Sequence, residues 1–278
     1  MIDSLIVLII TSITCSLLGV FLILRNLSML TDAISHTVLL GIVLAYFLVK
    51  DLDSPLLIIG ASLMGLLTVY LVESIGKKGI SKYDDAIGMV FPILFALAVI
   101  LISKFFRNVH LDTDVVLMGE VLFSSLVTTN IFGHQLPTSI LYGLAIMLLT
   151  LIFIISNYQK LKISTFDKDF AYLLGIPTSF LFYGLMSLTS ISAVVSFNSV
   201  GAILVISFFI GPGASSLEIC KNLKASLIAA SLIASINSII GFYLAIYLNV
   251  SIAGFIAFIN MFTYLAIIIA KKYIKYTS

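Results

Sequence analysis

The chain has 278 residues, of which 61% are hydrophobic and 10% are charged, and its mean hydropathy is +1.21. Soluble domains carry about 25% charged residues, so this composition excludes a soluble globular protein and predicts an all-α, polytopic membrane bundle. The net charge of +2 and the lack of a basic cluster with interleaved aromatic residues exclude a nucleic-acid partner.

Apolar stretches of the length that crosses a bilayer core, roughly 20 residues, follow one another along the chain. They cover 4–24, 30–49, 55–75, 87–103, 138–157, 178–197, 199–219, 225–247 and 252–270. We expect eight or nine transmembrane helices in a single domain, 1–278. The number depends on the junction at Phe197-Asn198-Ser199, which fits a tight turn, a broken helix or a re-entrant hairpin.

Positive residues gather in alternate connections between these spans. Twelve of the 15 Lys and Arg belong to one set: Arg25, Lys77, Lys78, Lys82, Lys160, Lys162, Lys168, Lys221, Lys224, Lys271, Lys272 and Lys275. By the positive-inside rule this set is cytosolic, so the C-terminus is expected in the cytosol. With nine spans the N-terminus lies outside, and with eight it lies inside.

The second predicted span holds an acidic residue and a histidine, Asp32 and His36, which share one helical face because they are four residues apart. A charge at membrane depth is costly without a partner, so the pair predicts a functional site whose partner is a divalent cation. Two alternatives stay open. The pair forms a hydrogen bond that fastens two helices, or Asp32 lies close enough to the headgroups to stay hydrated.

The longest connection, about 106–137, lies on the predicted outer side and carries Asp112, Asp114 and Glu120. These acids predict a candidate external cation path that acts through a diffuse field rather than by direct ligation. His110 and His134 belong to the same connection, and for them the alternative is that a loop in water is simply polar.

A short amphipathic helix is predicted at about 164–175, in a cytosolic loop. Ser164-Thr165 precedes Asp167 and Asp169 as at a helix start, and apolar residues recur at helical spacing. These apolar residues are Phe166, Phe170, Ala171 and Leu174. An exposed apolar helix face needs a partner protein. The alternative is a helix lying on the headgroups, which the two acids oppose.

Five stretches together resemble a known family, the ABC-3 permeases of bacterial manganese, zinc and iron importers. The similar stretches are 28–41 (Ser28-Met29-Leu30-Thr31-Asp32-Ala33-Ile34-Ser35-His36-Thr37-Val38-Leu39-Leu40-Gly41), 85–91, 111–114 with Gly119-Glu120, 166–171 with Gly175, and 194–196 with Val200-Gly201 and Pro212. The resemblance covers nearly the whole chain. Two residues depart from the pattern: Thr31 replaces a small residue, and Leu40 replaces a proline that would kink the helix past His36.

The resemblance implies the permease subunit of an ATP-driven importer in a bacterial cell membrane. Its implied partners are cytosolic ABC ATPase subunits, a second permease subunit and an extracytoplasmic metal-binding protein. It also implies that 164–175 is the coupling helix, with Phe166, Asp167, Phe170 and Leu174 docking on the ATPase, and that Asp32 and His36 bind the transported metal. No cofactor is expected to be permanently bound.

The choice of metal follows from the ligand types and from the resemblance. Carboxylate and imidazole without thiolate or a methionine cluster suit Mn(II), Zn(II) or Fe(II) and argue against Cu(I). The stretches around Asp32 and at 111–114 look more like the manganese branch than the zinc branch. Two ligands are too few for a transition metal, so we expect completion by the same pair from a second subunit, or by Asn198 or a backbone carbonyl.

ATP hydrolysis is expected in a separate subunit, because the sequence has no Gly-rich phosphate loop ending in Lys-Ser or Lys-Thr. The competing functions are a membrane-embedded metal-dependent enzyme and an ion-driven secondary transporter. The first normally needs more convergent groups and motifs that are missing here. The second is expected to show an inverted repeat or further intramembrane charges.

Overall fold

The computed structural model describes residues 1–51, 54–77, 83–105, 121, 128–131 and 134–277. Among these residues, nine helices are long and apolar enough to cross a membrane, which confirms the predicted all-α membrane bundle and favours nine spans over eight. They are α1 (Ile2–Leu24), α2 (Met29–Val49), α3 (Leu56–Lys77), α4 (Tyr83–Phe105), α6 (Thr138–Ser156), α9 (Thr178–Val200), α10 (Ala202–Ile219), α11 (Leu223–Leu248) and α12 (Ile252–Thr277).

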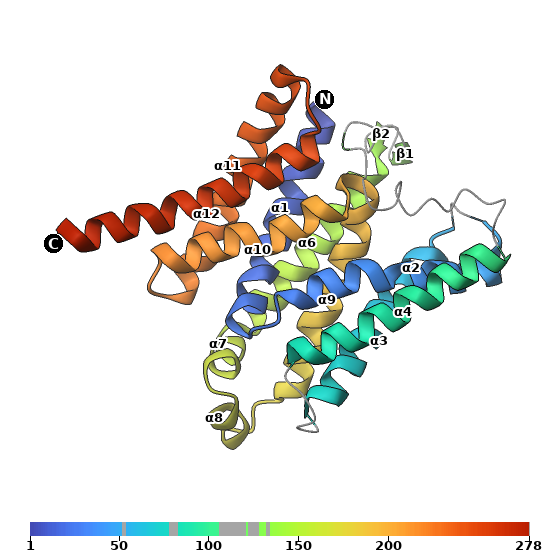
Figure 1. Cartoon of the computed structure of the whole chain (residues 1–278), viewed down its shortest axis with the longest axis horizontal. Helices are drawn as coiled ribbons and strands as arrows, with labels where there is room; N and C mark the ends of the chain where they lie inside the picture. The colour runs from blue at the N-terminus through green and yellow to red at the C-terminus, as the bar shows by residue number, and fades with distance from the viewer. Residues whose placement is uncertain (52–53, 78–82, 106–120, 122–127, 132–133, 278) are drawn as a thin grey trace.

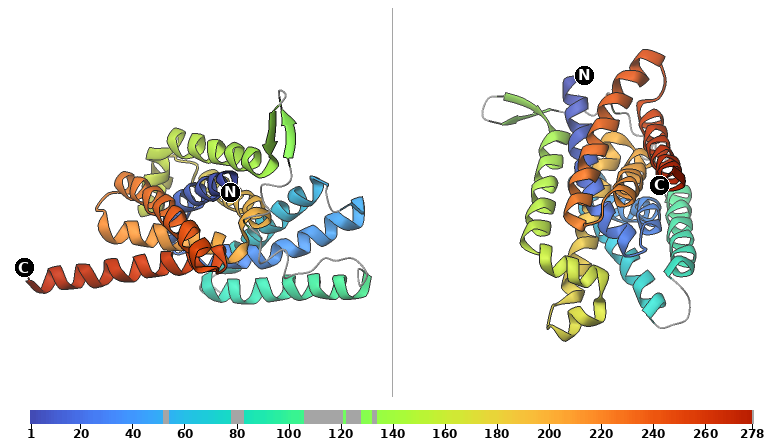
Figure 2. Two further views of the ribbon diagram at one scale, coloured as in Figure 1. Left: turned by 90° about the horizontal axis from the view of Figure 1, so that it is seen from above. Right: turned by 90° about the vertical axis from the view of Figure 1, so that its left-hand side faces the viewer.

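Four shorter elements lie at the two ends of this bundle. They are the strands β1 (Thr128–Ile131) and β2 (His134–Pro137) and the helices α7 (Tyr158–Phe166) and α8 (Lys168–Leu173). The strands pair antiparallel, with Thr128 opposite Pro137. The N-terminus and the hairpin lie at one end of the molecule, and α7 and α8 lie at the other (Figures 1 and 2).

The uncertain junction between the sixth and seventh spans is a tight turn at Gly201, three residues beyond Asn198. Helix α9 continues through Phe197-Asn198-Ser199 to Val200, and α10 starts at Ala202. Gly201 has φ 85 and ψ 154, a conformation that side chains disfavour and glycine tolerates. The chain therefore changes direction at one residue, and both flanking helices remain long enough to span.

Helix α1 lies at the centre of the bundle, where it contacts α6, α9, α10 and α11 (Figure 2, left). Its contact with α10 is a backbone contact: a Cβ built on Gly19 would lie 1.9 Å from the carbonyl oxygen of Phe209. Small residues permit such close approach in membranes, where dispersion and hydrogen bonding, rather than the hydrophobic effect, hold helices together.

Several polar side chains inside the bundle bond to one another across helices. Asn237 of α11 donates to the side-chain carbonyl of Asn260 of α12 at 2.9 Å, and Asn260 donates to the Ser207 hydroxyl of α10 at 2.9 Å. Thr263 adds a bond to Asn237 at 3.3 Å. These bonds join three helices inside the bundle, where lipid offers polar groups no partner.

Gly19→Ala should lower the thermal stability of the purified chain in detergent, because the new methyl must push α1 away from the α10 backbone. We expect a cost of about 1–3 kcal/mol, the usual range for overpacking, measured as a lower midpoint in fluorescence-detected size-exclusion chromatography after heating. Gly88→Ala is the matched control, since nothing lies within 4 Å of a Cβ there. Equal midpoints for the two variants would contradict the proposed contact.

Candidate metal site

Helix α2, which carries Asp32 and His36, is held in a fixed rotation by close packing against α3. A Cβ on Gly41 would lie 2.4 Å from the carbonyl oxygen of Gly60, and the Thr68 hydroxyl donates to the Thr37 hydroxyl at 2.8 Å. By helical geometry, Asp32 lies about 140° around α2 from Thr37. The packed face therefore leaves the carboxylate outside the α2–α3 contact. Leu40 replaces the proline that would kink this helix, and α2 accordingly runs unbroken to Val49.

Asp32 and His36 lie close together on α2 without forming a hydrogen bond. The distance from Asp32 Oδ1 to His36 Nε2 is 3.6 Å, and the two side chains are 47% and 31% exposed, respectively. Since both residues belong to one helix, their contact cannot fasten two helices together. Asp32 also lies in the first turn of α2, where the positive end of the helix dipole favours a carboxylate.

Aromatic rings of α4 pack against the imidazole of His36. The ring centroids of Phe91 and Phe95 lie 5.6 and 5.5 Å from that of His36. The Nδ1 atom of His36 is buried and has no hydrogen-bond partner among the described residues, whereas Nε2 faces Asp32. Nε2 is thus the atom available to an ion. Phe91 ended one of the recognised sequence stretches, but sequence alone assigned no role to either ring.

One chain offers fewer donors at this place than a transition metal usually takes. In the described part of the chain, no group of three or more His, Cys, Asp or Glu side chains could hold a metal ion. Asp112, Asp114, Glu120 and His110 lie outside the described residues, as do the side chains of His134 and Asn198. Asp32 and His36 therefore provide two donors, whereas transition metals in proteins usually take four or more.

The predicted helix at 164–175 is in fact divided in two, and the expectation that it starts at Ser164-Thr165 is wrong. Those residues end α7, and the chain is extended at Asp167, with φ −144 and ψ 98. The Asp167 side chain accepts a hydrogen bond from the Phe170 N–H at 2.8 Å, so it caps α8. Gly175, with φ 70, follows the end of α8.

Helix α8 and its flanks present apolar side chains to solvent. Phe166, Phe170, Tyr172, Leu173 and Leu174, here called the α8 patch, are each at least half exposed, whereas Ala171 is buried. Sequence periodicity missed Tyr172 and Leu173, because both fall off the predicted apolar face. A patch of this kind marks a surface for a partner.

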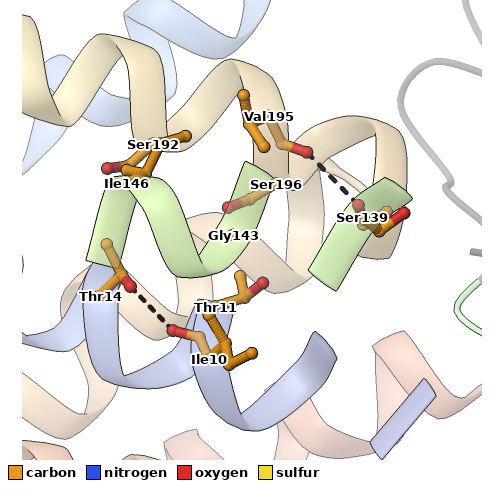
Figure 3. A pocket seen from close by; sticks show the side chains of 10 residues that line it. Ile10, Thr11, Thr14, Ser139, Gly143, Ile146, Ser192, Val195 and Ser196 are labelled. Carbon is orange, nitrogen blue, oxygen red and sulfur yellow. Dashed lines mark hydrogen bonds between the residues drawn. The ribbon is translucent and has the colours of Figure 1, made fainter. Parts of the chain in front are cut away.

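A separate cavity lies between α1, α6 and α9, and its lining is rich in hydroxyl groups (Figure 3). Its polar residues are Thr11, Thr14, Ser139, Ser192, Ser196 and Ser199. Two of these hydroxyls bond to carbonyls one turn back, Thr14 to Ile10 at 2.8 Å and Ser199 to Val195 at 3.4 Å. Among the described residues, the lining has no charged or imidazole group to match a divalent cation, so α2 remains the candidate metal site.

Comparison with known proteins identifies the chain's relatives. The pattern of ABC-3, the ABC 3 transport family, matches residues 1–271. The chain is 42% identical over 250 residues to the manganese transport system membrane protein MntD of Bacillus subtilis, covering 90% of this chain and 84% of MntD. It is also 42% identical over 249 residues to the zinc transport system membrane protein TroD of Treponema pallidum, covering 90% of this chain and 68% of TroD.

A solved structure has the same fold. PsaBC from Streptococcus pneumoniae, solved in complex with Fab, superposes with a TM-score of 0.78 at 29% sequence identity, covering 95% of this chain and 89% of that chain. The chain therefore belongs to the ABC 3 transport family and is a multi-pass membrane permease, a transport component rather than an ATPase.

Proposed function

We propose that this permease carries a divalent transition metal into the cell, with Mn(II) as the preferred ion and Zn(II) and Fe(II) next. The observation that carries the proposal is the Asp32–His36 pair, a carboxylate and an imidazole on one face of a membrane helix. Relatives named for manganese and for zinc are equally similar, at 42% identity. The preference for Mn(II) therefore rests on the residues around the pair and on the stretch 111–114.

Two copies of the pair would complete the site. A second permease subunit related by a two-fold axis would bring another Asp32 and His36 to the same ion, and water would fill any remaining position. Two carboxylates offset the charge of the cation, and two neutral imidazoles add nitrogen donors without adding negative charge. The partial exposure of both side chains supports this arrangement, because an ion shared between subunits needs ligands at the surface of each.

We propose that the α8 patch docks on a cytosolic ABC ATPase, because no described residue covers its side chains. This places α7, α8 and the C-terminus in the cytosol and the N-terminus outside, in agreement with the distribution of Lys and Arg. An extracytoplasmic metal-binding protein would deliver the ion at the opposite end, where the β1–β2 hairpin lies (Figure 1).

Asp32→Asn or His36→Ala should abolish metal uptake while the complex still assembles and hydrolyses ATP. The reason is that each change removes a donor from both halves of the shared site. Uptake of Mn(II), Zn(II) and Fe(II) into proteoliposomes that contain the permease, its ATPase and its delivery protein checks this. Asp3→Asn is the matched control, an acid in the first turn of α1. Near-normal import by both site variants would reduce the pair to a structural contact.

Phe170→Asp should uncouple ATP hydrolysis from uptake, because a charge in the middle of the α8 patch opposes its burial against a partner protein. Membrane insertion should be unaffected. Phe170→Leu keeps an apolar side chain and serves as the control. The measurement is copurification of the ATPase together with uptake rate, and normal uptake by Phe170→Asp would show that the docking surface lies elsewhere.

Replacing Asp112, Asp114 and Glu120 together by Asn and Gln should slow uptake mainly at low ionic strength. Long-range attraction between these acids and a cation or its delivery protein is screened over about 8–10 Å at physiological salt. Initial uptake rates between about 10 and 300 mM salt test this screening. A loss of the same size at every salt concentration would point to a specific contact or to structural damage.

A further inference from the structure

Arg25 joins the end of α1 to the short helices that carry the α8 patch. Its Nε atom donates to the Thr165 hydroxyl at 3.2 Å, and Nη2 donates to the Ser164 hydroxyl at 3.0 Å. The Ser164 hydroxyl in turn donates to the Leu161 carbonyl of α7 at 3.2 Å. One guanidinium thus holds two successive residues that lie directly before Phe166 and the capping residue Asp167.

This link is charged and half-buried. Burial lowers the pKa of the Arg25 guanidinium to about 10, so it stays protonated at neutral pH. Its hydrogen-bond partners in the described part of the chain are hydroxyls rather than carboxylates. Its position at the C-terminus of α1 is favourable for a cation, because the unpaired carbonyls there form the negative end of the helix dipole. Hydrogen bonds from a charged donor in such surroundings are stronger than neutral ones.

The α7–α8 unit packs on the bundle through α7, whose Leu161 is fully buried in the hydrophobic core. Helix α7 touches α1, α6 and α9, and α8 touches α7 and α9. Much of the apolar surface of α8 is exposed instead of packed on the bundle. Arg25 therefore ties the end of α7, which leads into the exposed helix α8, to α1, the central helix.

The chain that follows Arg25 leads within seven residues to Asp32 of the candidate metal site. The next residue, Asn26, has φ 57, and the Leu27 N–H bonds to the Leu22 carbonyl at 2.8 Å, so the chain turns by a compact helix-ending motif. Leu27 is buried, and its carbonyl accepts from the Leu30 N–H at 3.0 Å in the first turn of α2. Asp32 follows in that same turn. Two backbone hydrogen bonds, from Leu27 to Leu22 and from Leu30 to Leu27, thus fix the short corner between Arg25 and the first turn of α2.

We infer that Arg25 is a positioning residue that couples the ATPase-docking helix to the metal site. This inference rests on the proposed function. A displacement of α8 by the ATPase moves Ser164 and Thr165, and Arg25 passes that displacement to the α1–α2 corner and so to Asp32. The link consists of rigid elements and hydrogen bonds, which is the kind of contiguous contact that can carry coupling between distant sites.

The test compares transport with ATP consumption in proteoliposomes that contain the permease, its ATPase and its delivery protein, with Mn(II) as the probe. Arg25→Ala should lower the number of Mn(II) ions carried per ATP about fivefold or more. Arg25→Lys keeps the charge and should restore part of the ratio. Ser164→Ala with Thr165→Val, which removes the acceptors and keeps Arg25, should lower the ratio as Arg25→Ala does, and adding Arg25→Ala to that pair should lower it little further.

Lys271→Ala is the matched control, since Lys271 pairs with Glu218 at 2.7 Å on the exposed surface, away from α8. It should leave the ratio unchanged. A normal ratio in Arg25→Ala, an equal loss in the Lys271 control, or fully additive losses in the combined variant would each overturn the coupling role. Absence of uptake of Mn(II), Zn(II) and Fe(II) by the wild-type complex would overturn the proposed function itself, and the coupling role with it.

Discussion

Inside a bilayer, every polar group must find its partner within the protein, because lipid offers none. The bundle obeys this rule through hydroxyls that bond to carbonyls of their own helix, such as Thr14 to Ile10, and through the bonds between Asn237, Asn260 and Ser207. Asp32 and His36 depart from it, as do the buried hydroxyls of Thr150, Ser192 and Ser215, which have no partner among the described residues. The Asp32–His36 pair lies on an apolar helix with 3.6 Å between its polar atoms, and Nδ1 of His36 lacks a described partner. On the proposed function, a cation bound by the Asp32 carboxylate and by Nε2 of His36 is the partner that this partly exposed pair lacks within one chain.

Close backbone contact determines where that pair is presented. Glycines bring α1 against α10 and α2 against α3, so these helices cannot rotate without separating. The rotation of α2 directs Thr37 toward Thr68 of α3 and leaves Asp32 outside that contact. Phe91 and Phe95 of α4 then enclose His36 on another side. The small residues carry no chemistry themselves, yet they decide which face of α2 a partner can reach.

The spans were predictable because bilayer thickness sets helix length. Asp32 and His36 stood out as a candidate site because charge is rare within such spans, and their role stays a prediction. Other features depend on single residues or on distant contacts. Gly201 was not predicted as the site of the turn, because Asn198 and Ser199 are equally plausible turn residues. Asp167 divides α7 from α8 by capping, which the apolar spacing of the region does not reveal. The Arg25 contact joins residues 139 positions apart, and no local pattern encodes it.

On the proposed function, a metal site shared between two chains can change its affinity when the two chains move relative to each other. If each chain supplies two donors, affinity depends on how the two α2 helices face each other, and a small displacement of either helix removes half of the shell. Tight binding and release then differ by geometry alone, without a change in protonation or in ligand identity. The start of α2 is well placed for such control, because it follows a rigid corner rather than a long loop. On the proposed function, ATP hydrolysis would need to move this corner only slightly to convert a site that holds the ion into one that releases it.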